Sequence, residues 1–390
     1  MYQGKFVLTQ LTSIVSRYEF DKCVKRYKGN HRIRNLTCWQ QFICMMFGQL
    51  TNRESIRDII NCLTAYRTKI YHLGIKQVVA NSTLTRANES RDWRIWSDFA
   101  NYLINVARPL YVDDKEFGLE LENTAYALDS STIDLCLNVF KWAKFRKKKA
   151  AIKLHTLMDL QGNIPVFISI TSGKIHDVNI LDDLEYEAGA FYVMDRGYYD
   201  FLRLYRIKEA CAFFIIRTKK NFKSKRLYSR PKDKTAGIKF DQIIKLTGKK
   251  TAIVYPEKLR MIKYFHRENG KTYVFLTNNF EVEATQIAML YKKRWQIELF
   301  FKWIKQHLKI KKFWGHSPNA VKTQIWIAVC TYLLVAILKK KHNLTHSLYE
   351  ILQILSISPF NKTAIKQLLM NGDILKTEDG DSNQLNLFDL

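Results

Sequence analysis

The stretch Phe191-Tyr192-Val193-Met194-Asp195-Arg196-Gly197 runs from four apolar residues directly into an acid and a turn. A short apolar run that ends at turn residues is typical of a buried β-strand. The same pattern occurs upstream, where Tyr126-Ala127-Leu128 is followed by Asp129. An acid at the end of a strand lies at the sheet edge, where α/β proteins usually bind ligands. The alternative is that each acid caps a turn or a short helix.

Other short apolar or alternating runs surround these two and predict further strands at 151–160, 164–170 and 212–216. A helix is expected at 199–209. Strands that first form a meander and then alternate with helices predict a mixed α/β sheet covered by helices.

Residues 218–280 differ in character, because a Lys- and Arg-rich part precedes alternating runs at 251–255, 260–267 and 272–276. We interpret them as a β-rich insertion. One long helix is expected from about Glu283 to Leu308, with further helices to about Leu369. Acids dominate residues 371–390, which we expect to form a solvated tail.

Residues 1–110 are expected to be helical, with amphipathic segments at 54–66 and 93–106. A third helix at 82–90, capped by Asn81 or Ser82, follows a Gly-containing turn. This order is typical of a helix-turn-helix, which would place residues 82–90 in the DNA major groove. An ordinary helical bundle explains the pattern equally well.

The charge balance indicates a polyanionic partner. The 63 Lys and Arg against 36 Asp and Glu give a formal net charge of +27, far more than solubility requires. Basic clusters at 141–153, 217–234 and 292–312 are interleaved with aromatic residues. Such clusters suit phosphate contacts and base stacking, so nucleic acid is the expected partner.

Membrane insertion is not expected. The longest apolar run, 325–338, has about 14 residues, fewer than the roughly 20 that a membrane-spanning helix needs. We predict that it is a buried helix. Seven scattered cysteines and a polar N-terminus predict a reducing compartment without export.

The predicted helix 283–308 presents an ordered set of side chains. At about 100° per residue, Tyr291, Arg294, Glu298 and Lys305 fall within roughly 60° of one another. Glu298 would lie at the edge of the buried face. The alternative is a solvated ion-pair ladder with Arg294 or Lys302, which leaves Tyr291 and Lys305 unexplained.

This spacing, Tyr291-x2-Arg294-x3-Glu298-x6-Lys305, resembles the signature of bacterial insertion-sequence transposases of the DDE class. The resemblance includes Asp129 and Asp195 in the required order and covers about 120–335. It implies an α/β fold with a ribonuclease H-like mixed sheet and flanking helices. The implied parts are an N-terminal helical DNA-binding domain (1–110), a catalytic core (120–217 and 281–340), the β-rich insertion (218–280), C-terminal helices (341–370) and the tail (371–390).

The resemblance also implies the chemistry. Asp129, Asp195 and Glu298 would be the catalytic residues and would hold two Mg²⁺ ions, for which Mn²⁺ can substitute. Three carboxylates supply the hard oxygen ligands that such ions need. Tyr291, Arg294 and Lys305 would contact DNA, and Lys302 and Arg196 are added on position alone.

The expected activity is therefore cut-and-paste transposition. The protein would bind the terminal repeats of its element, cleave both ends and join the 3′ ends to target DNA. It would act as a homodimer on double-stranded DNA, in the prokaryotic cytoplasm at the nucleoid, without a membrane. The alternatives are a metal-dependent nuclease without strand transfer and an inactive DNA-binding regulator.

Two further points bear on the site. Some relatives stack a flipped base on a Trp in the β-rich insertion, yet residues 196–294 contain no Trp; Phe, Tyr or Trp295 could replace it. Asp134, Asp177 and Asp200 lie near motif residues, and we expect them to be structural or to support the ligands.

Overall fold

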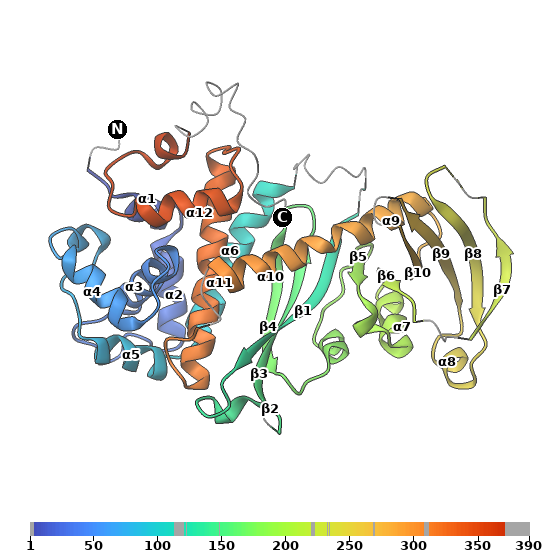
Figure 1. Ribbon diagram of the computed structural model, residues 1–390, viewed down its shortest axis with the longest axis horizontal. Helices are drawn as coiled ribbons and strands as arrows, with labels where there is room; N and C mark the ends of the chain where they lie inside the picture. Colours follow the sequence, from blue (N-terminus) through green and yellow to red (C-terminus); the bar gives the residue numbers. More distant parts are fainter. Residues whose placement is uncertain are drawn as a thin grey trace, which may run out of the picture. The chain divides into compact units, whose positions relative to one another are not determined.

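The computed structural model describes residues 4–112, 121, 123–147, 149–219, 223–231, 233, 235–267, 270–307 and 312–370 (Figure 1). The predicted tail at 371–390 and the predicted helix end at Leu308 lie outside these residues. The chain forms two compact units. We call Met1–Leu110 with Trp303–Leu390 the helical unit, and Tyr111–Lys302 the sheet unit.

The helical unit is built around one long apolar helix, α11 (Pro318–Lys341), which packs on α3, α5 and α6. At 24 residues α11 is long and apolar enough to cross a membrane, but 94% of its apolar window is buried inside the protein. The predicted buried helix is thus present and longer than expected. The other helices are α1 (Val7–Thr12), α2 (Arg17–Arg26), α3 (Cys38–Leu50), α4 (Ile56–Ala65), α5 (Asn81–Ser90), α6 (Arg94–Ala107) and α12 (Leu348–Ile357).

The helix-turn-helix interpretation is wrong in its geometry. Residues 66–80 separate α4 from α5 and include the 3-10 helix η1 (Ile70–Leu73), whereas that motif has a turn of three or four residues. The expected cap is also absent, because α5 already begins at Asn81 and its N-cap residue is Ala80. The helical bundle, the alternative explanation, describes this unit.

The sheet unit contains one ten-stranded mixed sheet with the order β2-β3-β1-β5-β6-β10-β9-β8-β7, and β4 pairs with β3. The neighbours β1, β5 and β6 are parallel, and the other pairs are antiparallel. The predicted mixed sheet with flanking helices is confirmed. Its strands are β1 (Ala125–Leu135), β2 (Lys144–Arg146), β3 (Lys149–Asp159), β4 (Ile164–Ser172), β5 (Phe191–Met194), β6 (Phe213–Arg217), β7 (Ser224–Ser229), β8 (Ile238–Leu246), β9 (Lys258–His266) and β10 (Lys271–Thr277).

Alternating side chains assign the two faces of this sheet. Tyr192, Phe214 and Leu276 share a core with α7 (Phe201–Glu209) and α8 (Lys249–Val254). On the opposite face, Phe275 contacts Tyr291 of α9 (Ala284–Lys293) with ring centroids 4.6 Å apart. We call these the α7 face and the α9 face.

Three local predictions are corrected. The expected strand 251–255 lies in helix α8, where Ala252 and Tyr255 donate backbone hydrogen bonds four residues back. Strand β1 does not end at Leu128, because its antiparallel pairing with β3 continues to Leu135. The long helix from Glu283 is interrupted at Arg294, so that α9 is followed by α10 (Trp295–His307).

The predicted domain bounds remain predictions. The compact units divide the chain differently near the C-terminus, because residues 303–340 group with the N-terminal helices. The reason is physical: α11 buries nearly its whole circumference among α3, α5 and α6, so its apolar contacts lie there.

A buried ion pair fastens β8 to β9. Arg260 and Asp241 have side-chain exposures of 1% and 3% and form two hydrogen bonds of 3.0 and 2.7 Å. Arg260 also donates to the carbonyl of Val282 at 2.5 Å. Two bonds to the carboxylate fix the guanidinium and compensate its loss of water.

Replacing Asp241 by Ala should therefore destabilise the protein by about 3–5 kcal/mol, because it leaves the Arg260 charge buried and unpaired. Urea unfolding would measure the loss. Glu209→Ala, which removes an exposed partner of Lys208, is the control and should cost less than about 1 kcal/mol. Equal losses in the two variants would contradict the role given to Asp241.

Candidate active site

The register of the parallel strands brings two predicted acids together. Ala127 pairs with Val193 and Leu128 with Met194, so the next residues, Asp129 and Asp195, stand side by side. Parallel neighbours lie about 4.8 Å apart. Both side chains follow the alternation onto the α9 face. Asp195 also accepts a hydrogen bond from the Gly197 amide at 2.6 Å, so the capping alternative is correct for this acid and fixes its carboxylate.

The third parallel strand, β6, places a cation beside Asp195. Val193 pairs with Ile215 and Met194 with Ile216, which places Arg217 in register with Asp195. Its guanidinium lies over the ring of Tyr273, 4.9 Å from the centroid. Sequence reasoning had placed Arg217 only in a general basic cluster. Its position at the end of a strand was visible, but the strand order that sets it beside Asp195 was not.

Arg294 connects the sheet to α10. Its Nη1 donates to Asp129 Oδ2 at 2.6 Å, and its Nη2 donates to Glu298 Oε1 at 2.8 Å. The Arg294 side chain is 13% exposed. Its Nε is buried without an acceptor among the described residues. One guanidinium thus holds two of the three predicted acids, and the interruption between α9 and α10 lies at this residue.

Burial governs the titration of Asp129. Loss of water raises the pKa of Asp129 to about 6, while Arg294 and the Ser130 amide act in the opposite direction. The negative charges of Asp195 and Glu298 raise this pKa further. These effects of Asp195 and Glu298 also place the three carboxylates within electrostatic reach of one another.

Tyr291 forms an aromatic patch beside these charges. Its ring packs on Phe275 at 4.6 Å and on Tyr273 at 6.5 Å, and Arg294 lies 5.6 Å from its centroid. Burial raises the pKa of the Tyr291 phenol, and the charges of Arg294 and Arg217 lower it. The hydroxyl therefore remains protonated at neutral pH.

The remaining predicted DNA contacts are less tightly placed. Arg196 is exposed in η6 (Arg196–Tyr198), directly after Asp195, and Lys302 is exposed on α10 one turn beyond Glu298. Lys305 lies in the part of α10 that groups with the helical unit. The structure therefore brings together Asp129, Asp195, Glu298, Tyr291 and Arg294, and it leaves the roles of the other three as predictions.

The opposite face carries a supporting network. Ser130 points to the α7 face and donates to Asp177 at 2.6 Å. Asp177 also pairs with Lys153 at 3.0 Å. The buried His155 side chain forms a hydrogen bond of 2.8 Å with the Thr171 hydroxyl. Burial lowers the pKa of His155 to about 4. These contacts hold β1 where Asp129 leaves the parallel pairing.

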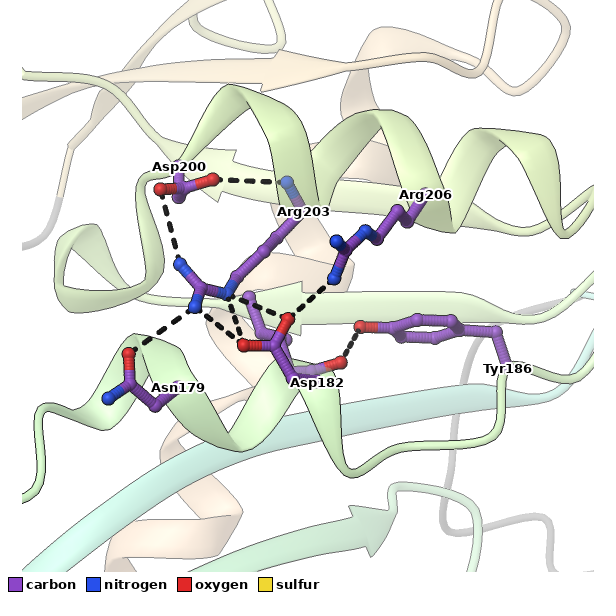
Figure 2. Close-up of polar contacts among 7 residues, drawn as sticks. Asn179, Asp182, Tyr186, Asp200, Arg203 and Arg206 are labelled. Carbon is purple, nitrogen blue, oxygen red and sulfur yellow. Dashed lines mark hydrogen bonds and ion pairs between the residues drawn. The ribbon is translucent and has the colours of Figure 1, made fainter.

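Asp200 is structural. Figure 2 shows it at the start of α7, where it accepts from the Arg203 amide at 3.0 Å and pairs with the Arg203 side chain at 3.3 Å. Arg203 and Arg206 both reach Asp182 of η5 (Asp177–Asp182), at 2.6 and 2.7 Å. Asp134, the other competing acid, is exposed on β1. The ion pairs tie α7 to η5 and occupy Asp200.

The carboxylate groups of the three predicted acids are chemically suited to bind a divalent cation. No group of three metal-binding side chains is assembled among the residues described. Asp129, Asp195 and Glu298 nevertheless supply carboxylate oxygens of the kind that Mg²⁺ prefers. The positive charge between Asp129 and Glu298 belongs to Arg294, which would have to release carboxylate oxygens for a metal ion.

Replacing Asp129 by Asn should stabilise the metal-free protein at pH 8. A folded pKa of about 6 lies above the ordinary 3.8, so the folded state binds this proton more tightly and loses stability as pH rises from about 4 to 6. Asn mimics the protonated acid, and the gain should reach about 3 kcal/mol at pH 8 and vanish below about pH 4.

Chemical unfolding at pH 8 and pH 4 would measure this difference in EDTA. Asp134→Asn, on the same strand but exposed, is the control and should change little. A loss of stability in Asp129→Asn at pH 8 would show that the attraction to Arg294 outweighs burial.

Comparison with known proteins identifies the family. Residues 121–334 match the family described as Transposase DDE domain, and residues 3–76 match a domain of unknown function, DUF4372. The chain is 34% identical over 256 residues to Putative transposase y4zB of Sinorhizobium fredii, covering 62% of this chain and 71% of that protein. It is 30% identical over 210 residues to the Probable transposase for insertion sequence element IS5377 of Geobacillus stearothermophilus, covering 53% and 55%.

A solved structure gives a weaker likeness. The cryo-EM structure of the piggyBac transposase synaptic complex with hairpin DNA has a TM-score of 0.44 and 11% identity, covering 97% of this chain and 82% of that chain. The family assignment follows from the DDE-domain match and the insertion-sequence relatives. The chain belongs to the DDE transposases of bacterial insertion sequences, which cleave DNA and transfer strands with the help of divalent metal ions.

Proposed function

We propose that this transposase excises its own insertion element and joins the 3′ ends to target DNA, using Mg²⁺ or Mn²⁺ held by Asp129, Asp195 and Glu298. The observation that carries the proposal is the register of β1 and β5, which sets Asp129 beside Asp195 on the face where Arg294 holds Glu298. Asp129 and Asp195 thus end neighbouring strands, and Arg294 connects Asp129 to Glu298 of α10.

Each acid contributes differently. Asp195 is oriented by its own turn, because its carboxylate accepts from the Gly197 amide. A Cβ at position 197 would lie 2.9 Å from that carboxylate oxygen, so a side chain there would displace the Asp195 carboxylate. Asp129 and Glu298 are instead oriented through Arg294. Bound metal ions would activate the attacking water or 3′-hydroxyl and stabilise the leaving oxygen.

The cationic and aromatic side chains around the acids would position the DNA. Arg294 lies between Asp129 and Glu298, and Arg217 stands beside Asp195 with its guanidinium on Tyr273. Both can neutralise phosphate next to the cut. We extend this role to Tyr291 and Lys305 from the family signature, and to Arg196 and Lys302 from their positions alone.

The remaining parts of the proposal follow from the activity. A homodimer on the terminal repeats, acting in the cytoplasm at the nucleoid, is proposed from the family alone. Trp295 is 57% exposed directly after Arg294. It offers a stacking surface for an unpaired base where the β-rich segment has no Trp.

Separate Asp129→Asn, Asp195→Asn and Glu298→Gln variants should each lower cleavage of an element-end duplex at least a hundredfold. Removing one carboxylate weakens metal binding without changing side-chain size. Gel analysis of nicked and joined products with Mg²⁺ would measure both reactions. Asp134→Asn is the matched control and should retain activity.

Cleavage by all three variants would refute the metal-site assignment. Cleavage by the unaltered protein without any joined product would instead indicate a nuclease.

Arg217→Ala should reduce the cleavage rate tenfold or more, because a phosphate beside Asp195 loses its cation. Single-turnover kinetics at saturating protein would separate this effect from weaker binding. Arg226→Ala, an exposed cation on β7, is the control. Equal rates in the Arg217 and Arg226 variants would remove Arg217 from the site.

A further inference from the structure

A row of three lysines crosses the far part of the sheet. Lys225 of β7 pairs directly with Lys245 of β8, and Lys245 pairs directly with Lys258 of β9. All three are exposed. Within the described part of the chain, none of the three has an acidic partner.

This arrangement is unfavourable for the isolated protein. Like charges directly opposite one another on neighbouring strands destabilise a sheet. A lysine on an edge strand can be explained by protection against edge-to-edge aggregation. That explanation covers Lys225, since β7 is an edge strand, but β8 and β9 are paired on both sides. Lys245 and Lys258 need another reason.

A groove lies along two of these lysines, Lys245 and Lys258. It has a volume of about 740 Å³, and its lining includes Lys245, Lys258, Arg230, Tyr228 and Phe280. Tyr228 and Phe280 are 54% and 38% exposed. The acid in the lining, Glu257, is paired with Lys208 at 2.5 Å. The groove is therefore cationic with aromatic walls, as expected for a nucleic-acid contact surface.

The row shares the α9 face with the acids. Lys258 alternates with Ile262 onto one face, and Ile262 pairs with Phe275, which pairs with Arg217. Lys258 lies four residues from Ile262 along β9, and β9 lies two strands from β6. Lys258 and Arg217 are therefore about 16 Å apart. This is roughly the length of five base pairs. The row and the acids therefore lie on the same face of the sheet, where α9 packs on Phe275.

We propose that the groove across β7, β8 and β9 binds the phosphate backbone of duplex DNA beside the cut site. Lys225, Lys245 and Lys258 span about 10 Å, which corresponds to about three consecutive phosphates of one strand. DNA binding relieves their mutual repulsion. The inference rests on the proposed function for its ligand, but it concerns binding and not the chemical step.

The test compares two triple variants. Lys225→Gln/Lys245→Gln/Lys258→Gln removes the charges, and Lys225→Arg/Lys245→Arg/Lys258→Arg keeps them. Affinity for a 30-base-pair element-end duplex is measured by fluorescence anisotropy at several salt concentrations in EDTA. The slope of log affinity against log salt should become shallower by about 2.7 in the Gln variant, at about 0.9 per phosphate. Affinity in low salt should fall at least tenfold, and the Arg variant should match the unaltered protein.

The melting temperature provides an independent readout. Without DNA, the Gln variant should melt at a higher temperature than the unaltered protein, because the repulsion is gone. A matched variant, Lys25→Gln/Lys76→Gln/Lys366→Gln, removes the same charge from exposed positions of the helical unit. It should leave the melting temperature unchanged and the slope less affected.

An unchanged slope in the Gln variant would overturn the proposal, and so would an equal rise of the melting temperature in the matched variant. Because binding is measured without metal, the result is separate from the cleavage assay. If the Gln variant lost binding while the acid variants cleaved fully, the proposal for the groove would stand and the assignment of the metal site would be wrong.

Discussion

The bridge from Arg294 to Asp129 and Glu298 is the interaction on which the proposed active site depends. A guanidinium is planar and rigid, so contacts of 2.6 and 2.8 Å fix a strand residue and a helix residue in relation to each other. Without this bridge, Glu298 would be a surface acid on α10. Burial around Asp129 opposes the arrangement, as its raised pKa shows. The site thus holds an acid whose charge is costly even though Arg294 pairs with it.

Contacts on the α7 face hold β1 in place despite the free-energy cost of burying the Asp129 charge. Ser130 and Lys153 hold Asp177 on the α7 face, immediately behind Asp129. The ion pairs of Arg203 and Arg206 with Asp182 then connect η5 to α7. Exposed ion pairs contribute little individually, but a network that joins two elements limits their relative motion. Charged residues near the acids are therefore used for positioning as well as for chemistry.

The charged residues of the protein have different roles. Arg260 and Asp241 pair in the core of the β-rich segment and stabilise it. Lys225, Lys245 and Lys258 face each other with no acidic partner among the described residues, and we expect them to destabilise it. Arg217 and Arg294 lie among aromatic rings and carboxylates at the site. A net charge of +27 predicted a polyanionic partner, but only these positions separate structural cations from those available to DNA.

The sequence alone determined the local units and the identities of the acids. Apolar runs that end at Asp129 and Asp195 predicted strands, and the spacing from Tyr291 to Lys305 predicted a helical segment with Glu298 at its edge. These predictions depend on contacts within a few residues, which local patterns encode. Local pattern failed at 251–255, where a helix forms, and at Arg294, where the helix is interrupted.

Only the tertiary structure decided which of these units meet. The order β1-β5-β6 and its register set Asp129 beside Asp195 and brought Arg217 into the same row. Strand order and register arise from the packing of residues far apart in the chain, so no local window contains them. For the same reason the lysine row appears only when β7, β8 and β9 are aligned. The sequence identified the chemical groups, and long-range packing decided which of them lie next to one another.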